Sequence, residues 1–350
     1  MEGNPKTLFM KKTALPILAA LVVIGVLVIF SLISGDRPKP LITLYDGQWN
    51  SLKINNAIVR FIIEKGYGYP VKIVEETSTM MQASMQDGEI DLNMEMWRQN
   101  YMVWYDEEIK KGSIVNLGMT FESSPQVFII PKWMSEQYDI KTVFDMRFSW
   151  ELFKDPENPS KGLFYNCIIG WTCKEVNEVK IEAYELSKFY NTITPGSQEA
   201  LKAALEHAQM NRQPIFAYYW IPTDIMADYE WHILEEPPYN DSTWKKIMEA
   251  IKDKKLRPLD QACAYPSPPI DKVAHKNLLK KAPDVVEMLR NMVIGLEPLN
   301  NTMAWKRKNE VKDFNKAAIY YLKNNKDRWK TWVTSDVYER INKALDENSG

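Results

Sequence analysis

The stretch that decides the fold spans residues 41–96 and reads LITLYDGQWNSLKINNAIVRFIIEKGYGYPVKIVEETSTMMQASMQDGEIDLNMEM. Apolar runs at 41–45, 71–74 and 90–96 predict three strands. Between the strands, residues 52–65 carry apolar side chains at helical spacing as far as Gly66, and residues 78–87 form a shorter helical pattern that ends at Gly88. This β-α-β-α-β order predicts a parallel sheet with helices packed on its faces.

A ligand site is expected beyond the carboxyl ends of these strands, where α/β sheets bind their ligands. Residues 46–49, which include Trp49, follow the first strand, and residues 95–101, which include Trp97 and Tyr101, follow the third. Glu95 should share the strand face of Trp97, because side chains two apart on a strand point the same way. Glu95 therefore either points into the site, where it would favour a cation, or bonds to a helix or to solvent.

A second lobe is indicated after residue 125. Residues 126–130 form another apolar strand, and Pro131 suggests the crossing into that lobe. Helical patterns at 176–190 and 197–210 and a strand at 215–219 would belong to it. The chain should return to the first lobe near 234–239, where two prolines interrupt regular structure, and be mostly helical from Thr243 onward, including 315–323 and 337–345.

The predicted division of the chain is therefore a two-lobed α/β protein with a helical C-terminal region. Its parts are residues 1–40 (cytoplasmic tip, membrane anchor or signal segment, and linker), 41–125 (first part of lobe 1), 126–234 (lobe 2) and 235–350 (return to lobe 1 with a helical extension).

Residues 14–33 form an uncharged, largely apolar run of 20 residues, which is long enough to cross a bilayer as a helix of about 30 Å. Lys6, Lys11 and Lys12 precede this run, so the positive-inside rule places the main domain outside the cytoplasm. Neither a small-x-small cleavage signature nor a lipid-accepting Cys is evident near Ser34, which favours a transmembrane anchor over a cleaved signal peptide. Both alternatives export the domain to the periplasm or the outer face of the membrane.

The charge balance argues against a nucleic-acid partner. The first 39 residues hold five of the 44 Lys and Arg and two of the 46 Asp and Glu, which leaves the rest of the chain at a formal charge of −5. Nucleic-acid binding would call for a basic surface. The twelve Trp are more than a core needs for apolar bulk, which indicates that some indoles serve recognition.

Four of these Trp stand where strands or their following turns should meet a cleft: Trp49, Trp97, Trp171 and Trp220. A trimethylammonium group cannot donate a strong hydrogen bond, so a protein that selects it must offer aromatic faces. Any single Trp could equally be a core residue. Their shared placement at strand ends favours a common pocket.

The segment from Cys167 to Cys173 encloses Trp171. Two Cys six apart in an exported domain can close a small disulfide loop that fixes the Trp and presents backbone N–H groups. Two buried thiols are the alternative. A zinc site is disfavoured because the three His show no ligand spacing, and Cys263 has no obvious partner.

The Cys-x5-Cys loop with its internal Gly-Trp, the string from Tyr218 to Pro222, and Trp97 at a strand end resemble the ProX-type glycine betaine-binding proteins of the OpuAC-like group. The resemblance covers residues 41–240. It implies a type II periplasmic-binding-protein fold, no enzymatic activity, no cofactor or metal, and ABC permease and ATPase subunits as partners.

The resemblance also implies roles for single residues. The ligand's ammonium group would sit in a box formed by Trp97, Trp171 and Trp220, and the backbone N–H groups of Thr172 and Cys173 would bind its carboxylate. The chain departs from the family pattern in three places: Tyr101 replaces a His at the carboxylate end, Thr172 replaces a Gly, and the C-terminal region is longer. Trp49 lies outside the three-Trp pattern and is either a fourth wall of the box or a packing residue.

Other function classes are less favoured. No nucleophile elbow, P-loop or metalloprotease helix motif appears, which argues against a hydrolase. A choline-binding or other osmolyte-binding protein, and a ligand-binding sensor subunit, remain open alternatives. The sequence does not determine which betaine or related solute is bound.

Overall fold

The computed structural model describes residues 38–347. The predicted membrane segment, residues 14–33, lies outside the described residues. Within residues 38–347, no helix has the length and apolar character needed to span a bilayer.

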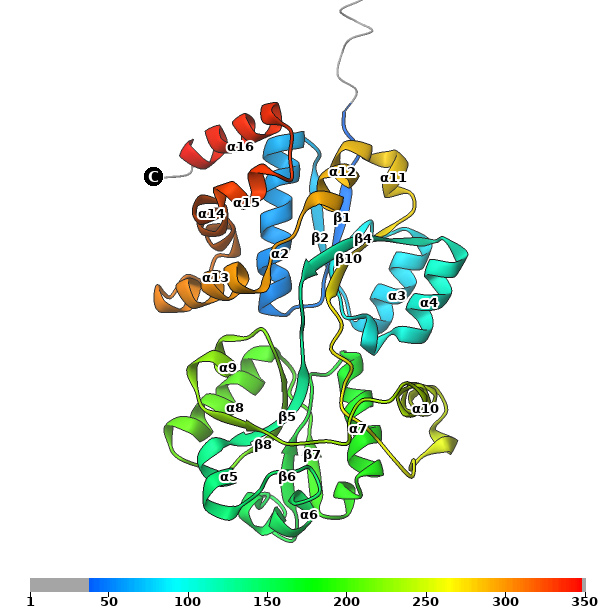
Figure 1. Cartoon of the computed structure of the whole chain (residues 1–350), viewed down its shortest axis with the longest axis vertical. Helices are drawn as coiled ribbons and strands as arrows, with labels where there is room; N and C mark the ends of the chain where they lie inside the picture. Colours follow the sequence, from blue (N-terminus) through cyan, green and yellow to red (C-terminus); the bar gives the residue numbers. More distant parts are fainter. Residues whose placement is uncertain (1–37, 348–350) are drawn as a thin grey trace, which may run out of the picture. The chain divides into compact units, whose positions relative to one another are not determined.

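The first lobe is built on a five-stranded sheet in the order β2-β1-β3-β10-β4 (Figure 1). Its strands are β1 (Ile42–Asp46), β2 (Val71–Glu75), β3 (Leu92–Met96), β4 (Ile114–Phe121) and β10 (Ile270–His275). The strands β1, β2 and β3 run parallel, as the β-α-β-α-β pattern predicted. The strand β10 was not predicted, and it lies antiparallel between β3 and β4, so the sheet is mixed rather than parallel.

The helices of this lobe follow the local signals in the sequence. Helix α2 (Asn50–Phe61) buries Leu52, Ile54 and Ile58 and continues into a π-helical turn, Ile62–Tyr67. It ends at Gly68, which adopts a left-handed backbone with φ of 73°, two residues later than predicted. Gly66 instead allows a close approach, since a Cβ there would lie 2.8 Å from Val337 Cγ1.

Helix α3 spans Ser78–Asp87 as predicted, with Thr77 as its N-cap and left-handed Gly88 after it. Further helices of this lobe are α4 (Met102–Lys111), α11 (Leu278–Lys281) and α12 (Pro283–Asn291).

The second lobe has its own five-stranded sheet in the order β7-β6-β8-β5-β9 (Figure 1). The strands are β5 (Gln126–Pro131), β6 (Gly162–Tyr165), β7 (Tyr190–Ile193), β8 (Phe216–Trp220) and β9 (Trp231–Ile233). The pairs formed by β6 with β7 and β8 are parallel, whereas β5 is antiparallel to β8 and β9. Its helices include α5 (Lys132–Tyr138), α6 (Met146–Ser149), α7 (Thr172–Ala183), α8 (Gln198–Met210) and α9 (Asp224–Asp228).

Helix α7 differs from the expected 176–190. It begins four residues earlier, at Thr172, and ends at Ala183. The residues from Tyr190 onward form the edge strand β7, which pairs with β6. The earlier start matters because it places the helix N-terminus directly after Trp171.

The chain returns to the first sheet later than the expected 234–239. Helix α10 (Asp241–Lys252) packs against α7 in the second lobe, and β10 is the next strand to join the first sheet. The indole of Trp244 on α10 also donates to the carbonyl of Gln99 at 3.1 Å, so this helix touches both lobes.

The C-terminal helices are α13 (Leu296–Lys308), α14 (Phe314–Asn324), α15 (Lys326–Lys330) and α16 (Ser335–Glu347). They lie beside α2, where α14 contacts α2 and α16 contacts the π-helical turn (Figure 1). Helix α13 also reaches the second lobe, because Arg307 pairs with Asp228 of α9. The extension is therefore part of the first lobe and also contacts the second through this ion pair.

Candidate functional site

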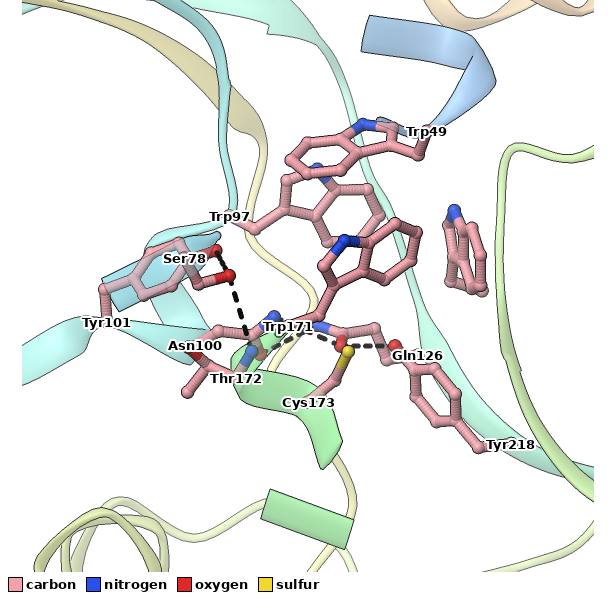
Figure 2. A pocket seen from close by; sticks show the side chains of 11 residues that line it. Trp49, Ser78, Trp97, Asn100, Tyr101, Gln126, Trp171, Thr172, Cys173 and Tyr218 are labelled. Atoms are coloured by element: carbon pink, nitrogen blue, oxygen red, sulfur yellow. Dashed lines mark hydrogen bonds between the residues drawn. The ribbon is translucent and has the colours of Figure 1, made fainter. Parts of the chain in front are cut away.

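A small pocket lies where the strand ends of the two lobes meet (Figure 2). The cavity that these side chains leave between them is about 30 Å³, well below the ~300–1,000 Å³ common for small-molecule sites, so the lining side chains would have to move apart to admit a ligand. Eleven residues line it: Trp49, Ser78, Trp97, Asn100, Tyr101, Gln126, Trp171, Thr172, Cys173, Tyr218 and Trp220. The structure thus brings together every residue that the sequence proposed for ligand contact.

The four Trp form a continuous aromatic chain. The ring centroids of Trp49 lie 6.4 Å from those of Trp97 and 5.4 Å from those of Trp171, and Trp171 lies 5.3 Å from Trp220, all with edge-to-face geometry. Trp49 and Trp97 come from the first lobe, and Trp171 and Trp220 from the second. Trp49 lines the pocket and lies between Trp97 and Trp171, so the structure places it with the three Trp of the predicted box.

Two of these indoles are held by Glu95. Its Oε2 accepts from Trp49 Nε1 at 2.6 Å and from Trp97 Nε1 at 3.2 Å. Ser51 and Asn55 of α2 donate to the same carboxyl group, at 3.1 and 2.7 Å. Burial raises the pKa of Glu95 to about 7, against the lowering effect of these donors. Of the two sequence expectations for Glu95, bonding to a helix holds, and the residue is not part of the pocket lining.

The opposite side of the pocket is polar and uncharged. The hydroxyl groups of Ser78 and Tyr101 lie 3.1 Å apart, and the backbone N–H of Thr172 points to Ser78 Oγ at 3.4 Å. Burial raises the pKa of Tyr101 to about 12, so its phenol stays protonated near neutral pH. The aromatic rings of Trp49, Trp97 and Trp171 lie to one side of these groups in Figure 2.

Three further polar residues form a network beside them. Asn100 and Gln126 exchange two hydrogen bonds through their amides, at 3.3 and 3.2 Å, and Tyr218 donates to Gln126 Oε1 at 2.7 Å. Because Asn100 belongs to the first lobe and Gln126 to the second, this network crosses the cleft.

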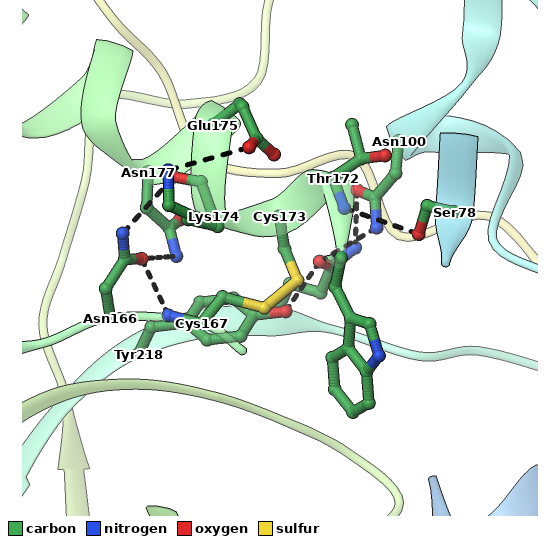
Figure 3. The surroundings of a disulfide bond; sticks show 12 residues. Ser78, Asn100, Asn166, Cys167, Thr172, Cys173, Lys174, Glu175, Asn177 and Tyr218 are labelled. Carbon is green, nitrogen blue, oxygen red and sulfur yellow. Dashed lines mark hydrogen bonds and ion pairs between the residues drawn. A yellow bond between two sulfur atoms is a disulfide. The ribbon is translucent and has the colours of Figure 1, made fainter. Parts of the chain in front are cut away.

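The loop that carries Trp171 is closed by the Cys167–Cys173 disulfide (Figure 3). The Cα atoms of the two Cys lie 5.8 Å apart. Gly170 has a left-handed φ of 86°, which an L side chain rarely adopts, and its carbonyl accepts from the backbone N–H of Ser78 at 3.0 Å. The loop therefore fixes Trp171 just before α7 and contacts the first lobe.

We expect the Cys167→Ser/Cys173→Ser double variant to lose about 2 to 3 kcal/mol of unfolding free energy, the chain-entropy effect of a short loop. Denaturant unfolding under non-reducing conditions measures this loss. Cys263→Ala is the matched control, because Cys263 is buried and free and its removal leaves the loop closed. Equal stability of the double variant and the wild type would contradict a structural role for the bond.

Direct hydrogen bonds join the lobes around the pocket. Trp171 Nε1 donates to the carbonyl of Gly47 at 2.9 Å, and the backbone N–H of Asn50 donates to Gln198 Oε1 at 2.9 Å. Together with the Ser78 contact to the loop, these bonds hold the cleft closed over the aromatic group.

Four lining residues were not proposed from the sequence: Ser78, Asn100, Gln126 and Tyr218. Ser78 follows strand β2 at the same sheet edge as Trp49 and Trp97, and Tyr218 shares a strand face with Trp220. Strand-end placement and two-residue spacing were therefore available signals for these two. Across residues 38–347, no cluster of three or more His, Cys, Asp or Glu is arranged to hold a metal ion.

The sequence model of the OpuAC family, described as the substrate-binding domain of ABC-type glycine betaine transport systems, matches residues 40–324. Among solved structures, the glycine betaine/L-proline-binding protein ProX from Borrelia burgdorferi is 18% identical with a TM-score of 0.68, covering 86% of this chain and 99% of that one. An ABC-transporter choline-binding protein in complex with choline is 17% identical with a TM-score of 0.68, covering 87% and 98%.

Lactococcal OpuAC, in its closed form with glycine betaine, is 15% identical with a TM-score of 0.65, covering 85% of this chain and 100% of that one. At these identities the structural matches establish the fold alone. They confirm the two-lobed α/β periplasmic-binding-protein architecture expected from the sequence.

Proposed function

This chain belongs to the OpuAC family of substrate-binding domains of ABC-type glycine betaine transport systems, and from that premise we propose that it captures glycine betaine, or a close relative, for import. Members of this family are extracytoplasmic binding proteins rather than enzymes, and quaternary-ammonium ligands and ABC transporter components are the partners that the family implies. Attachment to the outer face of the membrane through residues 14–33 is part of the proposal on sequence grounds alone.

The observation that carries the proposal is the convergence of four indoles from both lobes on one side of a small pocket whose other side is polar. A trimethylammonium group would face the rings of Trp49, Trp97, Trp171 and Trp220. Each ring contributes roughly 0.5 to 2 kcal/mol, so the set supports micromolar binding, about 8 kcal/mol.

The polar side suits a short anionic or hydroxyl tail. Helix α7 begins at Thr172, and its N-cap residue Trp171 makes no side-chain capping bond. The Thr172 N–H makes only a long bond to Ser78 Oγ, so a carboxylate that displaces this bond could accept from the N–H groups of Thr172 and Cys173. The hydroxyls of Ser78 and Tyr101 offer further donors. The aromatic and polar sides together match a zwitterion with a methylated cation at one end and a carboxylate at the other.

Choline is the second candidate, and one observation favours it. No Lys, Arg or His is among the residues that line the pocket. The Tyr101 phenol can donate a hydrogen bond but adds no positive charge. The pocket should therefore bind a carboxylate less strongly than a site with a cationic side chain would.

Isothermal titration calorimetry of the exported domain against glycine betaine, proline betaine, choline, carnitine and dimethylsulfoniopropionate tests the proposal. We expect glycine betaine to bind with a Kd of micromolar order, about 8 kcal/mol. Preferential binding of choline would select the second candidate. Absence of binding by every member of the panel would overturn the proposed ligand class.

A further inference from the structure

Glu95 is a buried acidic residue two positions before Trp97, and it is not among the residues that line the pocket. Its side chain is enclosed, with 1% of the residue exposed. It is bonded to two of the four indoles, through the Nε1 atoms of Trp49 and Trp97. Any change at Glu95 therefore acts on the pocket through these rings and through its charge.

We infer that Glu95 is a positioning and specificity-determining residue, which orients the indoles of Trp49 and Trp97 and places a negative charge behind them that selects a ligand with a cationic group over one with an uncharged group of the same shape. The inference rests on the proposed function and deepens it. The ring faces alone distinguish a cationic from an uncharged group only in part, and the charge of Glu95 would add to this discrimination.

The hydrogen bonds explain the positioning role. Both indole N–H groups are directed to Oε2, which fixes the rotation of each ring and leaves the ring faces for the ligand. Ser51 and Asn55 hold the carboxyl group from α2. All four neighbours donate, which is the arrangement that an ionised carboxylate accepts best.

The charge of Glu95 is not neutralised by a bonded cation among the described residues. The charged groups on neighbouring elements have other partners. On β1 and α2, Asp46 accepts from the backbone of Gln48 and Lys53 lies over the Phe314 ring. On β10, Asp271 accepts from Asn116 and Lys272 donates to three backbone carbonyls. In a dry environment an unpaired negative charge acts strongly on a nearby cation. The ligand's ammonium group would supply the missing positive charge.

Ligand binding should therefore be linked to ionisation of Glu95. Burial raises the pKa of Glu95 to about 7 in the free protein, and a bound cation favours the ionised form and lowers that pKa. Binding then releases a proton at pH values below about 7. Affinity for a cation must rise as the pH rises through this range and level off above it.

The surroundings of Glu95 provide a variant that changes charge with little change in shape. Asn55 Oδ1 is buried and accepts no hydrogen bond. In Glu95→Gln, the new amide oxygen can still accept from Trp49 and Trp97, while the new NH₂ can donate to Asn55 Oδ1 if the Asn55 amide turns over. Glu95→Gln therefore keeps the indole orientation and removes the charge, whereas Glu95→Ala removes both.

The test compares glycine betaine with 3,3-dimethylbutanoate, in which a carbon replaces the quaternary nitrogen, by calorimetry from about pH 6 to about pH 8.5, where both carboxylates are ionised. We expect Glu95→Gln to weaken glycine betaine binding by about tenfold, not to weaken the binding of the isostere, whose tert-butyl end is uncharged, and to remove the pH dependence. Glu95→Ala should weaken both ligands. Asp91→Asn is the matched control, because Asp91 is a buried carboxylate beside β3 that pairs with Lys281 away from the pocket.

Equal losses for both ligands in Glu95→Gln, or no loss for either, would overturn the inference while leaving the proposed function intact. Absence of quaternary-ammonium binding in the wild type would instead refute the proposed function. Burial also lowers the pKa of Lys272 to about 7, so Lys272 titrates over the same pH range as Glu95. If the affinity for glycine betaine still depends on pH in Glu95→Gln, that dependence belongs to another group such as Lys272. If Glu95→Gln fails to fold, the wild-type affinity ratio of betaine to isostere decides, and a ratio that is constant with pH refutes the charge role.

Discussion

Trp171→Ala should reduce the affinity for glycine betaine by at least about 100-fold, or about 3 kcal/mol. Trp171 contacts Trp49 of the first lobe and Trp220 of the second, and its Nε1 donates across the cleft to Gly47. The substitution removes a ring face for the cation, the packing that connects the other rings, and a bond that holds the lobes closed. Calorimetry measures the loss, and saturable quenching or enhancement of Trp fluorescence on titration should disappear with it.

Two variants make this result specific. Trp305→Ala also removes a Trp, but Trp305 stacks on Tyr320 in the C-terminal helices, so we expect ligand affinity to stay at the wild-type value. Trp171→Phe keeps an aromatic face and loses the N–H donor, and we expect an intermediate affinity. Wild-type affinity in Trp171→Ala would refute the aromatic pocket as the ligand site.

The elements that the sequence predicted well are those defined by neighbouring residues. Helix α3 matches its predicted bounds because Thr77 caps its start and Gly88 ends it, and both signals lie within one turn of the helix. Helix α2 was misjudged at its end because two glycines follow its apolar face. Gly68 ends the helix, whereas Gly66 serves packing against α16, a contact that no local pattern reveals.

Strand β10, in contrast, is defined by residues that lie far from it in the sequence. It lies between β3 and β4 in the sheet but follows the whole second lobe in the sequence, so its partners lie far away in sequence. All six of its residues are buried, but Asp271, Lys272 and His275 interrupt the apolar pattern. Lys272 is tolerated inside because Gly118, Met119 and Met292 supply carbonyl acceptors. A strand of this kind cannot be distinguished from a polar segment without its tertiary contacts.

The same distinction applies to the pocket. The Trp residues were found because large aromatic side chains at strand ends are rare enough to be informative. Asn100 and Gln126 were missed because single amides are common on surfaces, and only their mutual hydrogen bonds identify them as a network across the cleft. Glu95 was noticed in the sequence, but its link to two indoles depends on the rotation of the rings, which sequence does not define.

Behind the pocket, the second lobe encloses a buried ion pair whose disruption should have the largest effect on stability. Lys180 Nζ lies 2.7 Å from Glu236 Oε1, with side-chain exposures of 0% and 4%. The ammonium also lies over the rings of Phe128 and Tyr265, at 4.8 and 4.2 Å from their centroids. Tyr184 donates to the same Glu236 oxygen at 2.9 Å. Lys180 is on α7, the helix whose N-terminus borders the ligand pocket.

We expect Glu236→Gln to lower the unfolding free energy by about 3 to 5 kcal/mol, because it leaves the Lys180 ammonium buried without its counter-charge. Burial already lowers the pKa of Lys180, against the raising effect of Glu236, and loss of the carboxylate should lower that pKa further. The unfolded chain then binds more protons than the folded protein, so the stability of Glu236→Gln must rise with pH. Chemical denaturation at several pH values measures both effects.

The double variant Lys180→Met/Glu236→Leu separates burial of charge from loss of packing. It removes both charges and keeps apolar volume, so we expect it to recover most of the stability lost in Glu236→Gln. Glu230→Gln is the control for an ordinary ion pair, since Glu230 pairs with Lys132 on the surface, with side-chain exposures of 79% and 46%, and should cause no measurable change. If Glu236→Gln is as stable as the wild type at every pH, Lys180 and Glu236 do not form a desolvated ion pair. Recovery in the double variant, together with a steeper rise of stability with pH in Glu236→Gln than in the wild type, would show that the lobe tolerates an apolar replacement of the pair but not a lone charge.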